Sequence, residues 1–299
     1  MCLAVTEGML ASIAQFLAAH AIAMFSLSIG LRSDTRILEE MRARKRLLGR
    51  ALLACWIVVP LFAMAILLIL RPPHLAAAGL MVLAICPGVP LAIRTAGKRD
   101  GDATTSLIVL VATVVTAFVM IPLWSALLAH LTPVDVSIGA LSVGLVLFPQ
   151  LLLPLLIGLL IRELAPSFSK KLGVVANALF IAGLVIIAIV LVPKSIKMLV
   201  DMSGYAILAA ACIPIGGAAI GYIAGRPRRP DQISVAYAAG MGNPAMAVAV
   251  LAAASLPKAE MLPLLIAFVL IRVVGLLLFQ LWLRHQHRAT ISGELPASV

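Results

Sequence analysis

Charged residues are scarce in this sequence, making up 12% of its 299 positions, against about a quarter in ordinary soluble domains. Aromatic residues are also few, at 5%, whereas hydrophobic residues account for 63% and the mean hydropathy is +1.14. A soluble fold cannot hide that much apolar surface, so the composition excludes a soluble globular protein. Lipid must be the solvent for most of the chain.

Residues that build metal sites and active sites are also sparse. The four cysteines, Cys2, Cys55, Cys86 and Cys212, are scattered, mostly within apolar runs. They lack the paired spacing of a zinc site and the density of a disulfide framework. The five histidines stand singly or near the ends of apolar runs, whereas a membrane enzyme needs clustered catalytic groups at membrane depth. We therefore expect no enzymatic activity, no cofactor and no bound metal.

The apolar runs have the length of membrane-spanning helices. In lipid, only helices and closed barrels satisfy every backbone polar group. Runs of about 20 residues indicate helices rather than alternating strands of about ten residues. The sequence therefore predicts an all-α polytopic membrane protein, a single membrane domain over residues 1–299 with a cytoplasmic tail at 284–299. The nine predicted spans are residues 9–31, 51–70, 75–93, 103–128, 136–161, 172–193, 203–225, 233–256 and 261–283.

The basic residues follow a topological pattern. Of the 23 lysines and arginines, 18 follow the odd-numbered spans, four lie in the alternate connections, and Arg272 lies inside the ninth span. Cytoplasmic loops are enriched in Lys and Arg. The pattern therefore predicts an outside N-terminus and a cytoplasmic C-terminus in the cell (inner) membrane. Topology thus explains the net charge of +11, and we expect no nucleic-acid binding, which needs a basic patch beside aromatics.

Two of the predicted spans are interrupted. The third contains Cys86-Pro87-Gly88-Val89-Pro90, and the eighth contains Gly240-Met241-Gly242-Asn243-Pro244. Proline removes a backbone donor and clashes with the preceding turn, so neither segment can continue a regular helix. The topology makes the two spans antiparallel, and discontinuous helices in two inverted halves indicate a transporter substrate site near the bilayer midplane. The alternative is a pair of proline kinks that only shape packing.

These interrupted segments resemble the bile acid:sodium symporter family. The family's first pattern is Cys-Pro-Gly-Gly, then Ser-Asn, then Gly-Asp or Gly-Asn shortly before Ser, and Cys86-Pro87-Gly88, Gly101-Asp102 and Ser106 match it. Gly240-Met241 and Asn243 resemble its second pattern, Glu-x-Gly-Met-Gln-Asn. The resemblance implies an inverted-repeat transporter fold in which two discontinuous helices cross near the midplane. Members with nine helices lack the first helix of a five-plus-five repeat.

The sodium ligands that the resemblance implies are largely missing. Sodium is bound by oxygen, and Ser106 is the one clear survivor among those ligand positions. None of the 12 acidic residues lies inside a predicted span, so no carboxylate is evident for proton coupling at mid-membrane. The sequence argues against the family's two sodium sites. Side chains without oxygen occupy the remaining ligand positions that we compared: Ala92, Ile93, Leu110, Ala238 and Gly242.

Arg272 is the basic residue that lies at membrane depth. By the resemblance it takes the place of Asn in an Asn-x-x-Gly pattern, with Gly275 at the Gly. An arginine there costs at least ~2.5 kcal/mol and usually faces a polar interior or a partner. We expect its guanidinium to replace sodium's positive charge near the crossing, pairing an anionic substrate or joining the broken helices. The alternative is that it snorkels or bonds backbone carbonyls without touching solute.

Further polar residues near the breaks are candidates for substrate contact. Asn243 precedes Pro244, whose missing donor frees a carbonyl, so the Asn243 amide can bond either solute or unwound backbone. Thr95, Thr104 and Ser106 follow the first break. Their hydroxyls either contact solute or bond the backbone of their own helix.

Together these features predict a secondary transporter of a small organic anion, working by alternating access in the lipid bilayer. The missing ligands speak against sodium coupling. Two alternatives stay open: a non-transporting membrane receptor or assembly protein that keeps the fold, and, within transport, an arsenite-type carrier in which Cys86 would be the relevant residue. The sequence does not define the solute, the coupling ion or the oligomeric state.

Overall fold

The computed structural model describes residues 20–33, 36–88, 101–131, 145, 148–253 and 258–291. Every regular element in these ranges is a helix. Five of the described helices are long and apolar enough to cross a membrane. The all-helical, polytopic membrane class predicted from composition is therefore confirmed. The five helices are Lys45–Leu70, Ala103–Leu128, Pro166–Ile186, Gly204–Ala224 and Glu260–Leu283.

Several predicted features fall on residues outside these ranges. Four of the positions that the sequence singles out, Pro90, Ala92, Ile93 and Thr95, lie outside the described residues. The same holds for residues 132–144, where the fifth predicted span begins. Of the first predicted span, the described part is helical from residue 20 onward.

The chain divides into two compact units, which are described separately. Unit 1 comprises residues 1–43, 114–200 and 245–266. Unit 2 comprises residues 44–113, 201–244 and 267–299. Two long helices contribute to both units, α7 (Ala103–Leu131) and α14 (Lys258–Ile291).

Close backbone contact holds unit 1 together. Gly30, in the first described helix, and Gly158, in α9, lie so close that a Cβ on either would strike the backbone of the other helix. The Ser169 hydroxyl of α10 donates a hydrogen bond of 2.6 Å to the Leu31 carbonyl. Glycine at this crossing therefore lets two apolar helices pack at backbone distance. Unit 1 also contains α2 (Ile37–Ala43), η2 (Phe148–Leu152), α9 (Leu153–Leu164) and α10 (Pro166–Val200).

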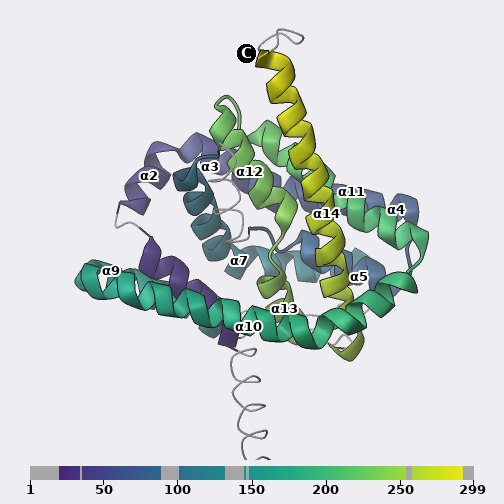
Figure 1. The fold of residues 1–299 in the computed structure, drawn as a ribbon, viewed down its shortest axis with the longest axis horizontal. Helices are drawn as coiled ribbons and strands as arrows, with labels where there is room; N and C mark the ends of the chain where they lie inside the picture. Colours follow the sequence, from purple (N-terminus) through teal and green to yellow (C-terminus); the bar gives the residue numbers. More distant parts are fainter. Residues whose placement is uncertain are drawn as a thin grey trace, which may run out of the picture. The chain divides into compact units, whose positions relative to one another are not determined.

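Proline does not end the long helices of this protein. The sixth predicted span ends at Pro193, but α10 passes through Pro193 and continues as one helix to Val200 (Figure 1). Pro122, Pro214 and Pro263 likewise lie inside α7, α11 and α14. Membrane helices tolerate proline where neighbouring groups satisfy the freed backbone. A proline alone is therefore a weaker sign of a break than the glycine-proline pairs in unit 2.

Unit 2 contains both interrupted segments. Within it, α11 and α12 pack at backbone distance, since a Cβ on Gly221 of α11 would strike the Val235 carbonyl of α12. The Ser203 hydroxyl caps α11 by accepting from the Ala206 amide. The elements of unit 2, besides its share of α7 and α14, are α3 (Lys45–Leu53), η1 (Ala54–Val58), α4 (Val59–Leu70), α5 (His74–Ala84), α11 (Gly204–Ala224) and α12 (Arg229–Met241).

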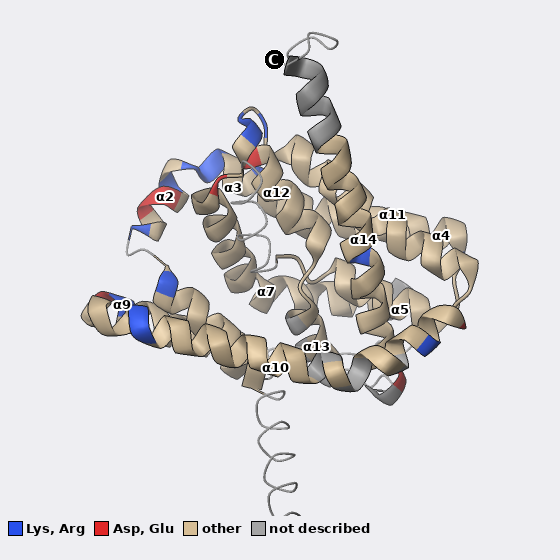
Figure 2. Cartoon of the chain, viewed as in Figure 1, with Lys and Arg blue, Asp and Glu red and all other residues tan. Residues whose placement is uncertain are grey.

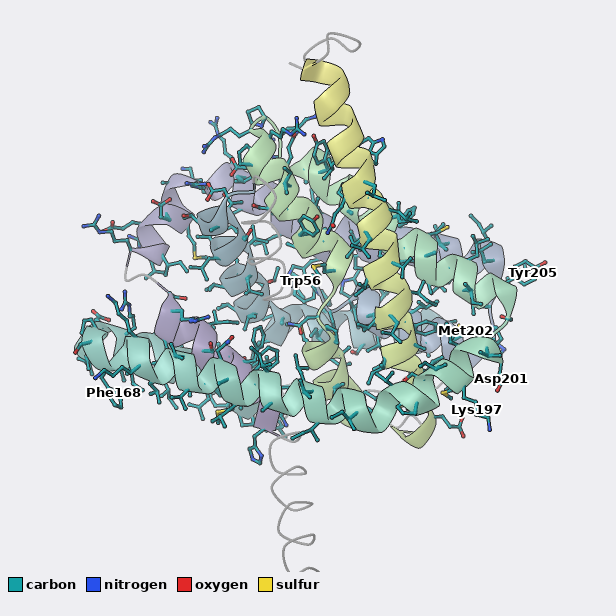
Figure 3. The ribbon with its side chains drawn as sticks, viewed as in Figure 1. Trp56, Phe168, Lys197, Asp201, Met202 and Tyr205 are labelled. Atoms are coloured by element: carbon teal, nitrogen blue, oxygen red, sulfur yellow. The ribbon has the colours of Figure 1, made fainter. Side chains whose placement is uncertain are left out.

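The side chains of unit 2 sort by polarity and burial. Helices α4, α5 and α11 carry no Lys, Arg, Asp or Glu and are tan throughout in Figure 2, whereas charge gathers on α3 and the turn into α12. Trp56 in η1 is 2% exposed and lies among the helices, while Tyr205 at the start of α11 is 64% exposed and points outward (Figure 3). These three helices therefore contain no charged side chain, whereas α14 contains Arg272 in its interior.

Candidate functional site

The first interruption begins where α5 ends at Ala84, after which residues 85–88 are not helical. Gly88 has a φ of +80°, which side chains with a Cβ rarely adopt. A Cβ at this position would also lie 2.6 Å from the Thr113 hydroxyl oxygen. Both the backbone angle and the space therefore require glycine at position 88.

The second interruption separates α12 from α13 (Pro244–Ala253). Helix α12 ends at Met241, and Gly242 and Asn243 are not helical. Gly242 has a φ of +59°, again in the region that favours glycine. Pro244 then opens α13, as expected for a residue with a fixed φ and no amide hydrogen. The glycine thus turns the chain and the proline restarts the helix.

Two backbone hydrogen bonds join the interruptions directly. The Gly88 amide donates to the Ala238 carbonyl at 3.1 Å, and the Asn243 amide donates to the Cys86 carbonyl at 2.5 Å. A break in a membrane helix leaves amides and carbonyls without partners in their own helix, and these must be satisfied within the protein. Here each break provides a carbonyl that accepts a hydrogen bond from an amide of the other break, so the two segments form one local structure.

Arg272 of α14 lies beside this crossing. It is only 4% exposed, and its Nη1 donates a hydrogen bond of 3.1 Å to the Met241 carbonyl, in the last turn of α12. Among the described residues, no carboxylate forms an ion pair with Arg272. The structure therefore places a buried cation, held by a neutral carbonyl, at the meeting point of the two breaks.

Gly242 makes room for that cation. A Cβ built on Gly242 would overlap Nη1 of Arg272 and would also come within 3.1 Å of the Leu83 carbonyl oxygen. Any side chain at position 242 would therefore displace the guanidinium. The residue at position 242 therefore determines whether the Arg272 guanidinium can lie at the crossing, although the two positions are far apart in the sequence.

Asn243 is 1% exposed, and its backbone amide forms part of the crossing. This hydrogen bond to Cys86 comes from the backbone and does not involve the side-chain amide. Whether the side-chain amide also contacts solute stays a prediction.

The polar residues at the start of α7 have local partners. The Ser106 hydroxyl donates to the Asp102 carbonyl at 3.1 Å, four residues back in the chain. The Thr104 amide donates to an Asp102 carboxylate oxygen at 2.8 Å, so Asp102 caps this helix. The Ser106 contact fits the alternative in which this hydroxyl bonds the backbone of its own helix. Substrate contact by Ser106 and Thr104 stays a prediction.

Sequence reasoning missed a charge cluster at the starts of α7 and α12. Arg44 Nη1 lies 2.7 Å from Asp102 Oδ2 and 3.5 Å from Asp231 Oδ1, and it donates to the Thr105 hydroxyl at 2.7 Å. That hydroxyl in turn donates to Asp231 at 2.6 Å. Two backbone contacts support the cluster, from the Asp102 amide to the Pro230 carbonyl and from the Ser234 hydroxyl to the Asp102 carbonyl. The cluster thus ties three helix starts together.

Part of this cluster had a sequence signal. Aspartate directly before a helical run is a common N-cap, so Asp102 could have been recognised as one. The pairing of Thr105 with Asp231 joins residues 126 positions apart, and no local pattern foretells it. Arg44 belonged to a basic run that the sequence explains by topology alone.

The surroundings of Asp102 act on its pKa in opposite directions. Desolvation is the largest single influence and raises the pKa of Asp102. The hydrogen bond and charge of Arg44, with the amides of Thr105 and Thr104, favour the carboxylate and together outweigh desolvation. The net result is a pKa of Asp102 below its usual value, so this residue carries its charge at neutral pH.

The residues at the crossing do not fit a sodium ion. Leu110, Ala238 and Gly242 occupy implied ligand positions and offer no side-chain oxygen, whereas sodium needs oxygen ligands. The Ala238 carbonyl accepts from Gly88, so it is already engaged in the crossing. The Arg272 guanidinium adds a fixed positive charge to the same place, and it repels a second cation. Chemistry and charge therefore both disfavour sodium here.

Comparison with known proteins identifies the family of the chain. The chain is 26% identical over 200 residues to the probable sodium/metabolite cotransporter BASS2, chloroplastic, of Oryza sativa subsp. japonica. The aligned part covers 66% of this chain and 46% of that relative, so the chain spans about half the length of the curated relative it matches. The sequence profile described as "Sodium Bile acid symporter family" matches residues 19–202. With more than half of its residues under that match, the chain belongs to the sodium bile acid symporter family.

Proposed function

We propose that this protein is a secondary transporter that moves a small organic anion across the cell (inner) membrane by alternating access. The observation that carries the proposal is the pair of hydrogen bonds through which the two interrupted segments meet, from Gly88 to Ala238 and from Asn243 to Cys86. Discontinuous helices of this kind expose backbone groups and helix ends to a solute. A pair of isolated proline kinks would have no reason to meet in this way. The family of the chain and its relative, named as a cotransporter, support the same class.

An anion is the solute that suits the charge at the crossing. The buried Arg272 guanidinium has the Met241 carbonyl as its hydrogen-bond partner among the residues described. A carboxylate or sulfonate matches the planar donor array of a guanidinium. An arsenite-type carrier would rest on Cys86 alone, because Ala238 stands where the resemblance implies a Glu. We therefore favour the organic anion over the metalloid.

The proposed arrangement in the membrane extends the prediction from sequence. It has nine spans in an inverted repeat, an outside N-terminus and a cytoplasmic C-terminus, with the crossing near the bilayer midplane. The distribution of 18 basic residues after the odd-numbered spans supports this orientation. The protein would change the location of its solute and not its covalent structure, so we propose no enzymatic activity.

Reconstitution into liposomes tests the transport function. The purified chain is incorporated into vesicles, and uptake of radiolabelled lactate, succinate, benzoate and methanesulfonate is measured under outward, inward and pH gradients. We expect saturable uptake of at least one of these anions above that of protein-free vesicles. Absence of flux for all four under every gradient would overturn the proposal and favour the receptor or assembly role.

A further inference from the structure

We infer that Arg272 is a resident cation that replaces bound sodium at the crossing, and that Gly242 is the position that admits it. The part concerning the transported anion rests on the proposed function; the part concerning sodium does not. In this arrangement the positive charge is covalently attached to α14. The protein would then need no sodium ion to attract its anion.

The steric argument comes from position 242. The family has Gln there, whereas this chain has Gly242, and a Cβ on it would overlap Nη1 of Arg272. A glutamine at position 242 would therefore require this guanidinium to shift from the place that it has in this geometry. The missing oxygen ligand at position 242 and the cation at position 272 therefore lie in direct steric contact.

The electrostatic argument comes from the partners of Arg272. Its described hydrogen bond goes to the Met241 carbonyl, and the parts of the chain that the structure describes supply it with no carboxylate. A guanidinium carries five N–H donors in a fixed fork. One carbonyl uses a fraction of that capacity and leaves the charge uncompensated. A carboxylate or sulfonate solute would supply both the missing acceptors and the missing negative charge.

The third argument comes from two ligand positions that the resemblance implies and that lack side-chain oxygen here. Ala238 stands where the family has Glu, and Leu110 where it has Thr. The Leu110 side chain packs against the turn at Gly88, within 3.3 Å of where a Cβ would stand. Methyl groups near the crossing therefore take positions that would otherwise bring oxygen to a cation. A guanidinium attached to α14 stays at the crossing without these side-chain ligands.

This arrangement has a consequence for energy coupling. A sodium ion that binds and leaves with the solute draws transport along its own gradient, whereas a guanidinium on α14 never leaves the protein. Transport of the anion is therefore expected to follow the anion's own gradient, or exchange for another anion, with no dependence on sodium.

The first test uses sodium alone and the unmodified chain. Thermal unfolding of the purified protein is compared in sodium chloride and in choline chloride at equal ionic strength. A ligand that binds the native state raises its apparent stability. We expect the same midpoint in both salts. A higher midpoint in sodium at every salt concentration would overturn the inference, whatever the transport assay shows.

The second test uses charge variants of position 272. Binding of the four anions of the uptake experiment is followed by thermal shift for Arg272→Gln, Arg272→Lys and the matched control Arg46→Gln, an exposed arginine of α3. We expect Arg272→Gln to weaken binding at least tenfold and sodium not to restore it. Arg272→Lys should retain part of the affinity and Arg46→Gln all of it. Unchanged affinity in a folded Arg272→Gln protein would contradict the inference.

The third test examines the pairing of Gly242 with Arg272 by a double-mutant cycle. Gly242→Ala adds the Cβ that collides with the guanidinium and also strains the backbone at its positive φ. The backbone strain persists in Arg272→Gln, but the collision disappears. We expect Gly242→Ala to lower the unfolding midpoint less in the Arg272→Gln background than in the wild type. Equal shifts in both backgrounds would show that the two positions act independently.

The outcomes also separate this inference from the proposed function. Anion uptake that requires a sodium gradient would overturn the resident cation and leave the transporter intact. A protein that carries none of the four anions would overturn the transporter. The sodium comparison and the double-mutant cycle would still decide whether Arg272 replaces the ion.

Discussion

Unit 2 contains two arginines in contrasting surroundings. Arg44 lies among two carboxylates and a hydroxyl, with 25% of its side chain exposed. Arg272 is 4% exposed and has one neutral carbonyl as its described partner. The less exposed of the two is therefore the one without an anionic partner in the described structure.

This difference teaches how to separate structural from functional charge. A buried cation that is paired and hydrogen-bonded has its desolvation cost offset within the protein. Removing it leaves its anions unpaired and destabilises the fold. A buried cation with only a carbonyl is a cost to stability, and it persists where function requires it. The same substitution at the two arginines should therefore have opposite consequences.

The largest expected effect is on stability at the charge cluster. Arg44→Met would leave Asp231, whose side chain is 6% exposed, without its nearest cation. Breaking a buried pair in this way should lower the free energy of unfolding by about 3 kcal/mol. Denaturant titration in mixed micelles measures the change. Arg44→Lys is the conservative control and should lose less stability than Arg44→Met, because it keeps the positive charge. If Arg44→Met lost less stability than Arg44→Lys, the role assigned to Arg44 would be contradicted.

The second expected effect is on stability at Arg272 and has the opposite sign to that at Arg44. Arg272→Met replaces an uncompensated buried charge by an apolar side chain, so the free energy of unfolding should stay unchanged or rise by about 1–2 kcal/mol. Anion uptake in liposomes should fall at the same time. The two measurements on one preparation separate loss of function from loss of fold. A destabilisation as large as that of Arg44→Met would remove the contrast between the two arginines.

The third effect concerns pH and Asp102. Because its pKa is lowered in the folded protein, the charge of Asp102 contributes stability above the unfolded value of about 3.9, and this contribution is lost as the pH falls through the folded value. Asp102→Asn should cost about 1 kcal/mol at neutral pH and flatten the stability curve in the acid range. Unfolding titrations between neutral pH and acid measure the slope.

The control for this experiment is Asp201→Asn, an exposed aspartate before α11 (Figure 3). It removes the same charge from a position outside the cluster. An equal change of slope in both variants would trace the effect to net charge and remove the special role of Asp102.

The sequence predicted the parts of this structure that depend on local chemistry. Long apolar runs specify membrane helices because the backbone must be satisfied within each segment. Glycine beside proline marked both interruptions, and in the structure Gly88 and Gly242 adopt positive φ. Pro193 shows the limit of the same reasoning, since α10 passes through it. Position in the fold decides whether a proline breaks a helix.

The contacts between segments that are distant in the chain could not be predicted from the sequence. Arg272 stood out by its depth, yet its proximity to Gly242 depends on how α14 packs against the second break. Asp231 and Arg44 looked like residues of separate polar connections, although their side chains lie 3.5 Å apart. Such pairings come from tertiary packing, for which a single sequence has no local signal.

The smallest expected effect tests whether an exposed arginine next to the charge cluster contributes to its stability. Arg228 Nη1 lies 3.9 Å from Asp231 Oδ2, and 62% of its side chain is exposed. Exposed pairs at this distance contribute ~0–1 kcal/mol because water and salt screen them. Arg228→Ala should therefore leave the unfolding free energy within about 0.5 kcal/mol of the wild type, as measured by the same titration. A loss of stability approaching that of Arg44→Met would mean that both arginines stabilise the Asp231 carboxylate. The exposure of an arginine would then not predict its contribution to stability.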